Sequence, residues 1–512
     1  MCKNNPKTHI PSVQTMRVCT EQPTFHYIWM NMLRRTRIIL AALFIVGITL
    51  LFTGIGTEWW GWMAKLQFLP AVLGLNFAVI AGVLALTLIM GRIYCSVICP
   101  LGIFQDIIIW LRRLYAKVFK KAYARRKKSS AKRFTYSKPR KWLRYGVLAA
   151  IVICIAAGIQ GAVLLVAPYS AYGRMVTVAA GKSLAWPLIA VAGVTFVGLV
   201  VLAWLYGRAW CSNICPVGTT LGLVSKHAMF RIGIDQDKCI ACRKCERECR
   251  AACIDIKGGK VIDHSRCVDC FDCIGVCDAG GIKLRWAWGK PSEKAQVAAP
   301  AAEKPSNRRE FIEKTAVLAG GLALTGLEAK AQIQGGFAPI TPKQDPERET
   351  PLVPPGAVSV KRFYDRCTGC QLCVSNCPSG VLKPSTDLGH LLQPHMSYAD
   401  GYCRPECNVC GTVCPAGAIE PLGKFEKLTV SWGVAHVYHK DCLQRQGVDC
   451  GTCVRHCPVG AIRMVTNRAG RQVPVVNEEI CIGCGACENL CPVRPISAVR
   501  VNGRSKHVRQ NG

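Results

Sequence analysis

The hydrophobic residues of this chain are concentrated in four long stretches that precede residue 210. They lie at 38–56, 66–90, 145–166 and 184–206, and none of them contains Asp, Glu, Lys, Arg or His. About 20 consecutive apolar residues are enough to cross the hydrocarbon layer of a membrane as a helix. The pattern therefore predicts four membrane spans.

Basic residues flank these stretches unevenly. Arg34, Arg35 and Arg37 precede the first one, and the connection 112–144 holds 15 Lys and Arg and no acidic residue. Because cytoplasmic loops are rich in Lys and Arg, we expect the amino terminus, this connection and the segment after the fourth stretch to face the cytoplasm. The formal net charge of +34 is then a topology signal. No nucleic-acid partner is expected, since the connection lacks the interleaved aromatic residues of a stacking surface.

A short motif is repeated inside this region. The segment 91–102 recurs as 207–218, 116 residues later, with eight of twelve positions identical. Each copy contains Cys-Ser-x-x-Cys-Pro, which supplies the four cysteines Cys95, Cys99, Cys211 and Cys215. Four thiols on two matching loops can bind a metal together, exchange electrons as dithiols or simply pack. We expect a redox or metal role.

Most of the 32 cysteines fall in six further quartets. Three cysteines spaced C-x2-C-x2-C line a loop around one [4Fe–4S] cluster, and a fourth, separated from the third by three residues, reaches a partner cluster. Zinc sites lack this third and fourth cysteine, so the spacing predicts six [4Fe–4S] clusters. The 24 ligands are Cys239, Cys242, Cys245 and Cys249; Cys267, Cys270, Cys273 and Cys277; Cys367, Cys370, Cys373 and Cys377; Cys403, Cys407, Cys410 and Cys414; Cys442, Cys450, Cys453 and Cys457; and Cys481, Cys484, Cys487 and Cys491.

Within the first two quartets the fourth cysteines are expected to be exchanged. Cys277 then completes the loop that begins at Cys239, and Cys249 completes the loop that begins at Cys267. Cys253 lies four residues after Cys249, where other quartets carry Val381, Ala418 and Ala461. We therefore interpret Cys253 as a packing residue.

These features together resemble a pair of bacterial families. Residues from about 30 to 290 resemble the NapH-type membrane subunit of quinol dehydrogenases, through the four apolar stretches, the two Cys-x3-Cys-Pro segments and the first two quartets. Residues from about 305 to 500 resemble the four-cluster ferredoxins of the NapG and MauM type, through four quartets in order and the widened spacing between Cys442 and Cys450. The chain departs from this pattern in joining both parts, and in carrying Arg250 and Asp278 where proline is usual after the fourth cysteine.

The resemblance implies a fold class and a pairing of cysteines. The fold class is an α-helical membrane domain of four spans followed by two α+β bacterial-type ferredoxin modules. In the four-cluster module it implies nested pairing, in which the outer quartets exchange Cys377 and Cys491 and the inner quartets exchange Cys414 and Cys457. Sequential pairing of neighbouring quartets stays open. The expected domains are a cytoplasmic segment 1–33, a membrane domain 34–228, a two-cluster ferredoxin 229–288, a linker 289–307, an export signal or anchor 308–331, a Pro-rich spacer 332–358 and a four-cluster ferredoxin 359–502.

The junction between the two parts carries a recognisable pattern. Arg308 and Arg309 precede an apolar run at 315–327 and a small residue, Ala331. Twin arginines before a short apolar run are typical of a signal that exports folded proteins. We expect the segment to be cleaved after Ala331 or to remain as an anchor, with the four-cluster module in the periplasm. A surface helix that leaves this module in the cytosol is the alternative.

The resemblance also implies a function. The membrane quinone pool is the expected donor, and a periplasmic reductase, such as nitrate or nitrous oxide reductase, or its cytochrome c partner is the expected acceptor. The chain would then be an electron-transfer component of a quinol dehydrogenase in the bacterial inner membrane. The alternative is an accessory protein that supplies electrons for maturing a periplasmic metalloenzyme or methylamine dehydrogenase. No catalytic residue and no quinone-binding residue are predicted.

Overall fold

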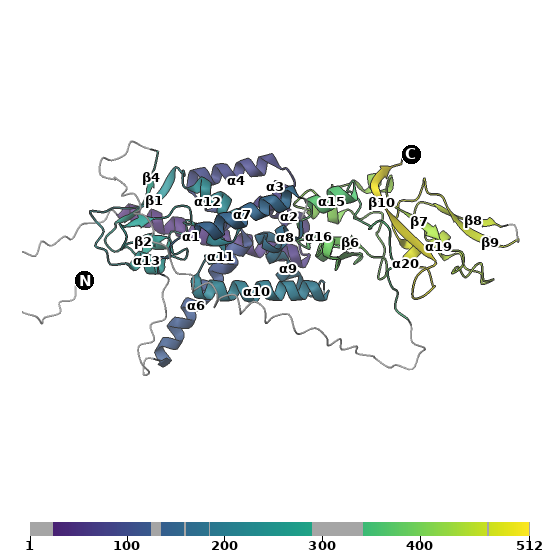
Figure 1. Cartoon of the computed structure of the whole chain (residues 1–512), viewed down its shortest axis with the longest axis horizontal. Coiled ribbons are helices and arrows are strands. Elements are labelled where there is room, and N and C mark those ends of the chain that lie inside the picture. The colour runs from purple at the N-terminus through teal and green to yellow at the C-terminus, as the bar shows by residue number, and fades with distance from the viewer. Residues whose placement is uncertain are drawn as a thin grey trace, which may run out of the picture. The chain divides into compact units, whose positions relative to one another are not determined.

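The computed structural model describes residues 24–123, 135–157, 160–183, 185–288, 341–467 and 470–510. The predicted export signal 308–331, with Arg308, Arg309 and Ala331, lies outside the described residues, as do residues 332–340 of the predicted spacer. Within them the chain forms a helical domain and two modules of short helices and two-stranded sheets (Figure 1).

The helical domain differs from the expectation of four continuous spans. Two helices are long and apolar enough to cross a membrane: Met32–Thr53, the greater part of α1 (Thr24–Thr53), and α10 (Trp186–Tyr206). The second expected span is divided into α3 (Phe68–Leu73) and α4 (Phe77–Met90). The third is divided into α7 (Lys141–Ala156) and α8 (Gln160–Val166).

The division between α3 and α4 has a local cause. Leu75 adopts a left-handed conformation with φ of 55°, which no continuous right-handed helix accepts. The side-chain carbonyl of Asn76 then accepts a hydrogen bond from the backbone N–H of Val79 at 3.3 Å and caps α4. The backbone N–H groups in the first turn of a helix have no carbonyl partner within it, and a capping side chain supplies one. The apolar stretch can therefore restart here as a new helix.

The repeated motif has the same local structure in both copies. After α4 the chain forms α5 (Tyr94–Val97) and α6 (Pro100–Tyr123), and after α10 it forms α11 (Ala209–Asn213) and α12 (Pro216–Ser225). Pro100 and Pro216 occupy the first position of their helices, where proline removes no hydrogen bond. The remaining helices of the domain are α2 (Thr57–Lys65) and α9 (Pro168–Ala179).

The first module follows α12. Its outer sheet pairs β1 (Phe230–Ile234) with β4 (Ile282–Trp286), antiparallel and with Ile232 opposite Leu284. Its inner elements are α13 (Lys244–Glu248), β2 (Ile254–Asp255), β3 (Val261–Ile262) and α14 (Asp272–Gly275). Each cysteine quartet therefore runs through a loop into a one-turn helix.

The second module contains three two-stranded sheets. The longest strands, β7 (Val430–Val437) and β10 (Val499–Arg509), are antiparallel. Trp432 on β7 is fully buried. The other elements are α15 (Val360–Arg366), α16 (Leu372–Ser375), β5 (Leu382–Pro384), the 3-10 helix η1 (Leu388–His390), β6 (Pro394–Met396), α17 (Val409–Val413), α18 (Lys424–Leu428), α19 (Thr452–Arg455), β8 (Ile462–Thr466), β9 (Gln472–Val476) and α20 (Ala486–Asn489).

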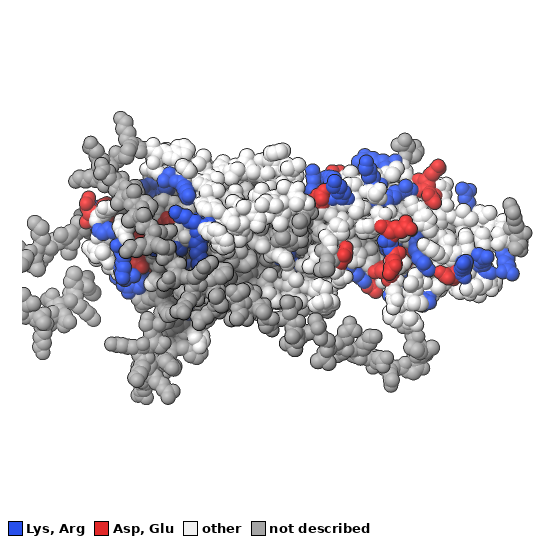
Figure 2. Space-filling view, viewed as in Figure 1, with Lys and Arg blue, Asp and Glu red and all other residues white. Residues whose placement is uncertain are grey.

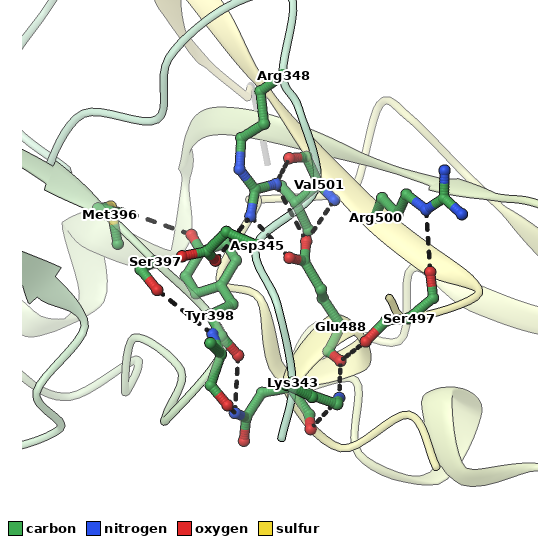
Figure 3. A network of polar contacts seen from close by, with 12 residues as sticks. Lys343, Asp345, Arg348, Met396, Ser397, Tyr398, Glu488, Ser497, Arg500 and Val501 are labelled. Atoms are coloured by element: carbon green, nitrogen blue, oxygen red, sulfur yellow. Dashed lines mark hydrogen bonds and ion pairs between the residues drawn. The ribbon is translucent and has the colours of Figure 1, made fainter. Parts of the chain in front are cut away.

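A polar network fastens the start of this module to its end (Figure 3). The carboxylate of Glu488 pairs with the guanidinium of Arg348 at 2.7 Å and accepts the backbone N–H of Val501 at 2.7 Å. Lys343 donates to the backbone carbonyls of Glu488 and Asn489. Burial, with Arg494 nearby, lowers the pKa of Lys343 to about 8. The segment that leads into the module is thereby bonded to α20 and β10.

Candidate functional site

The cysteines of the first module line two cavities. One is surrounded by Cys239, Cys242, Cys245 and Cys277, and its empty space is about 370 Å³. Each cavity thus takes its first three cysteines from one quartet and its fourth from the other.

The second cavity of this module contains a cysteine that sequence reasoning assigned to packing. Cys249, Cys267, Cys270 and Cys273 line it, and so does Cys253. The sulfur of Cys253 lies 3.5 Å from that of Cys249, and Cys253 is 2% exposed. Hydrogen bonding with Cys253 lowers the pKa of Cys249 despite its burial. Cys253 therefore belongs to the wall of the site.

The second module pairs neighbouring quartets. Cys414 joins Cys367, Cys370 and Cys373 around one cavity. Cys377 joins the next three cysteines, Cys403, Cys407 and Cys410, around another.

The last two quartets follow the same rule. Cys457 joins Cys481, Cys484 and Cys487 around one cavity. Cys491 packs against Cys442 and interacts electrostatically with Cys453.

Nested pairing of this module is therefore wrong, and sequential pairing is what the structure shows. The physical reason is chain length: neighbouring quartets close short loops, and closing a shorter loop costs less entropy. Consecutive elements are also usually adjacent in space.

The cysteine loops share an unusual backbone. In four quartets the second residue after the first cysteine and the residue after the second cysteine have positive φ. These pairs are Ala241 and Arg243; Asp269 and Phe271; Gly369 and Gln371; and Gly483 and Gly485. Left-handed conformations are strained for residues other than glycine. Their recurrence indicates that the loop is shaped by the group that it surrounds.

The thiols fit an iron–sulfur cluster by their chemistry. Burial raises the pKa of Cys245 and Cys370 to about 11 and that of Cys484 to about 12. Four buried thiolates need a cationic group at their centre, because uncompensated buried charges are costly. Within the described residues no three His, Cys, Asp or Glu side chains are placed to hold a single metal ion. Four cysteine thiolates are the donor set of [4Fe–4S] clusters.

Two buried cations lie beside the cavities of the second module. The ammonium of Lys427, 1% exposed, donates to the sulfur of Cys403 at 3.2 Å. Arg174 on α9 is fully buried and donates to the carbonyl of Leu164 at 2.9 Å. Its neighbour Gly173 faces the carbonyl of Cys370, which an added Cβ would approach to 2.5 Å. Neither cation belongs to a cysteine motif, so no sequence signal pointed to them.

The four cysteines of the repeated motif lie inside the helical domain. Cys95, Cys99, Cys211 and Cys215 are each at most 5% exposed. Three of them, Cys95, Cys99 and Cys215, belong to the main apolar core. The structure therefore brings both copies of the motif into one core.

Comparison with protein families gives three matches. A family described as a 4Fe-4S binding domain matches residues 72–117 and 188–234. A 4Fe-4S dicluster domain matches 448–494, and a further 4Fe-4S binding domain matches 360–383. Each match contains cysteines described above.

Individual relatives agree with these matches. The chain is 34% identical over 209 residues to the methylamine utilization ferredoxin-type protein MauM of Methylobacillus flagellatus, which is 39% of this chain and 84% of that protein. It is 33% identical over 201 residues to the ferredoxin-type protein NapG of Escherichia coli, 37% of this chain and 83% of that protein. Ferredoxin-type protein NapF of Escherichia coli is 29% identical over 145 residues, 28% of this chain and 82% of its own. No solved structure gives a significant match.

Proposed function

We propose that this chain, which belongs to the family of ferredoxin-type proteins that includes MauM and NapG, carries electrons from membrane quinol to an acceptor on the opposite side of the membrane. Iron–sulfur electron transfer is the activity of the family. The donor, the acceptor and the route across the membrane are the proposed part.

The observation that carries the route is the pair of contacts made by α1. Near one end, the guanidinium of Arg34 pairs with Asp272 of the first module at 3.0 Å. Near the other, the carbonyl of Leu51 accepts the side-chain N–H of Asn376 of the second module at 3.0 Å. Seventeen residues at 1.5 Å each separate these contacts by about 25 Å, close to the thickness of a hydrocarbon layer. The two modules thus contact one apolar helix at points that suit the two faces of a membrane.

The surface of the helical domain supports a position in lipid. Ile39 of α1, Phe77 of α4 and Val194 of α10 are exposed by 66%, 75% and 74%. The visible surface over α4 carries no Lys, Arg, Asp or Glu, whereas charged side chains cover much of both modules (Figure 2). Large exposed apolar surface is rare on soluble proteins.

Ion pairs hold the first module against the helical domain. Asp106 of α6 forms a bidentate pair with Arg208, at 2.8 and 2.6 Å, and a further pair with Arg250 at 3.1 Å. Burial would raise the pKa of Asp106, but the guanidinium groups of Arg208 and Arg250 lower it well below its usual range. Arg250 also pairs with Asp272 at 2.6 Å. The arginine that replaces the usual proline after Cys249 is therefore part of this docking surface.

The second module contacts the helical domain beside its first cavity. The hydroxyl of Ser170 on α9 donates to the carbonyl of Thr368 at 2.7 Å. Thr368 lies directly after Cys367 in the loop that lines this cavity. A cluster there would adjoin the helical domain, with the other three clusters leading away along the module.

In this proposal the 24 cysteines hold six [4Fe–4S] clusters, each of which accepts and passes one electron without proton chemistry. The chain's own groups bury the clusters, exclude water and set the local charge. The export pattern at Arg308 and Arg309 supports a periplasmic second module. The acceptor is then a periplasmic reductase, such as nitrate or nitrous oxide reductase, or its cytochrome c partner.

A second function is favoured by the names of the relatives. MauM relatives are described by methylamine utilization, which suits a protein that supplies electrons for maturing methylamine dehydrogenase or a periplasmic metalloenzyme. Under this alternative the same clusters act during assembly and not during respiration.

Anaerobic reduction by a quinol analogue tests the proposal. The purified full chain is mixed with the analogue, and cluster reduction is followed by electron paramagnetic resonance (EPR). We expect reduced-cluster signals, and steady turnover when a soluble oxidant is added. Clusters that dithionite reduces but that stay oxidised at every quinol concentration would reject quinol as donor. A defect confined to maturation of a partner enzyme in a deletion strain would favour the second function.

A further inference from the structure

The two copies of the repeated motif contain four thiols that belong to none of the six cysteine quartets. The segments matched by the first 4Fe-4S binding family, 72–117 and 188–234, contain four cysteines in all. These are Cys95, Cys99, Cys211 and Cys215. A match to a cluster-binding family therefore falls on a region whose only thiols are these four.

The two copies hold each other by reciprocal hydrogen bonds. Arg92 of the first copy donates to the carbonyl of Cys211 in the second at 3.1 Å. Arg208 of the second copy donates to the carbonyl of Cys95 in the first at 2.8 Å. The first cysteine of each loop is thus positioned by the arginine of the other loop.

Glycine at the end of each motif permits this approach. A Cβ on Gly102 would lie 2.1 Å from the carbonyl oxygen of Cys95, and a Cβ on Gly218 would lie 2.2 Å from that of Cys211. No side chain fits at these distances. Each thiol loop therefore packs closely against the first turn of the helix that follows it. In the second copy, the sulfur of Cys215 accepts a hydrogen bond from the backbone N–H of Gly218 at 3.4 Å.

A buried positive charge lies beside these thiols and would stabilise them as thiolates. Arg92 is fully buried; it donates to two carbonyls and, at 3.7 Å, to the sulfur of Cys95, and its charge also acts on the buried carboxylate of Asp269. Its Nε and the hydroxyl of Ser212 are buried without a hydrogen-bond partner. A buried guanidinium is stable only beside compensating negative charge. Gln105 also donates to the sulfur of Cys211 at 3.3 Å, which stabilises an anionic sulfur.

We propose that Cys95, Cys99, Cys211 and Cys215 ligate a seventh metal centre, an iron–sulfur cluster held between the two repeats. The four thiols lose their protons on binding, and Arg92 balances the charge of the thiolates. The proposal goes beyond the six-cluster function and adds one site to it.

The position of the centre gives it a role in the electron path. Arg92 also donates to the carbonyl of Ser265 at 3.1 Å, two residues before Cys267 of the first module. A cluster held by these thiols would therefore lie inside the helical domain, on the side that contacts the second cavity of that module. It would connect a donor in the helical domain to the soluble clusters.

Native mass spectrometry of the full chain, prepared anaerobically, tests the proposal by counting bound iron and sulfide. The variants are C95S/C211S and C99S/C215S, and the control is C154S, whose cysteine lies on α7 away from every motif. We expect each double variant to carry one cluster fewer than the wild type and the control, with the EPR signals of the other six unchanged.

Two results would overturn the proposal. One is an equal cluster count in the wild type and both double variants. The other is recovery of disulfide-linked peptides joining these cysteines at a full count of six clusters, which would assign a dithiol and not a metal site. If a double variant fails to accumulate, C95S and C215S are measured singly for a cluster whose EPR signal is altered. A wild type without any iron would refute the proposed function itself, which separates the two failures.

Discussion

The ammonium group of Lys427 lies 3.2 Å from the sulfur of Cys403, inside the second module. It also donates to the carbonyls of Arg404 and Cys407, at 2.6 Å each. A buried positive charge at this distance stabilises the more negative, reduced form of a cluster. Lys427 should therefore raise the reduction potential of a [4Fe–4S] cluster held in this cavity.

Replacing Lys427 by methionine keeps the volume and removes the charge. We expect the midpoint potential of one cluster to fall by an amount on the order of 59 mV, which is a tenfold change for a one-electron couple. Potentiometric titration followed by EPR measures it. K383M is the matched control, because Lys383 pairs with Asp400 at the exposed surface of the same module. Equal potentials in K427M and K383M would contradict the assignment.

Arg174 makes a parallel prediction from the helical domain. Its guanidinium is buried and interacts electrostatically with Cys370. Burying a guanidinium is costly unless a negative charge lies near it. R174Q is expected to lower the potential of a different cluster from the one that K427M affects. The control R362Q removes an arginine that pairs with Glu420 at the surface. A shift in the same signal as K427M, or none, would show that Arg174 has only a packing role.

Asp106 should stabilise the docking of the first module. D106N leaves Arg37, Arg208 and Arg250 without their shared carboxylate, and removing one member of a buried ion network costs about 3–5 kcal/mol. Urea-dependent proteolysis of the first module measures the loss. D278N, at the exposed pair of Asp278 with Lys244 in the same module, should cost far less. Equal costs would place Asp106 outside the docking surface.

The same carboxylate gives a pH dependence with a definite sign. Its folded-state pKa lies below the unfolded value of about 3.9. The stability that it contributes is therefore fully present above that unfolded pKa and is lost only as the pH falls through the lowered folded-state pKa. The difference between wild type and D106N should stay constant from pH 8 to pH 5. A difference that shrinks across this range would indicate that Asp106 titrates normally.

Sequential pairing predicts which variants share a spectroscopic signature. C414S and C370S should alter the same EPR signal, because both cysteines line one cavity. C457S and C484S should alter another. Nested pairing would instead couple C414S to the loop that contains Cys450, so a shared signal between C414S and C450S would contradict the structure.

The sequence predicted features that depend on local length and composition. It missed features that depend on single residues or on contacts between residues far apart in the chain. The first and fourth apolar stretches correspond to Met32–Thr53 and Trp186–Tyr206, because length and composition define a long helix. The breaks after Leu73 and Ala156 depend on single residues that hydropathy averages over. Exchange between quartets depends on how loops close in space. Lys427 and Arg174 lie at least 17 residues along the chain from the cysteines with which they interact. The helices that carry them contain no recognisable motif.

The side of the membrane on which each module lies is the most direct test of the account. One epitope is placed after residue 510 and another in the connection between α6 and α7, and intact right-side-out and inverted vesicles are treated with protease. We expect the first epitope to be cleaved only in right-side-out vesicles and the second only in inverted ones. Cleavage of both epitopes in the same vesicle preparation would place both modules on one face and contradict electron transfer across the membrane.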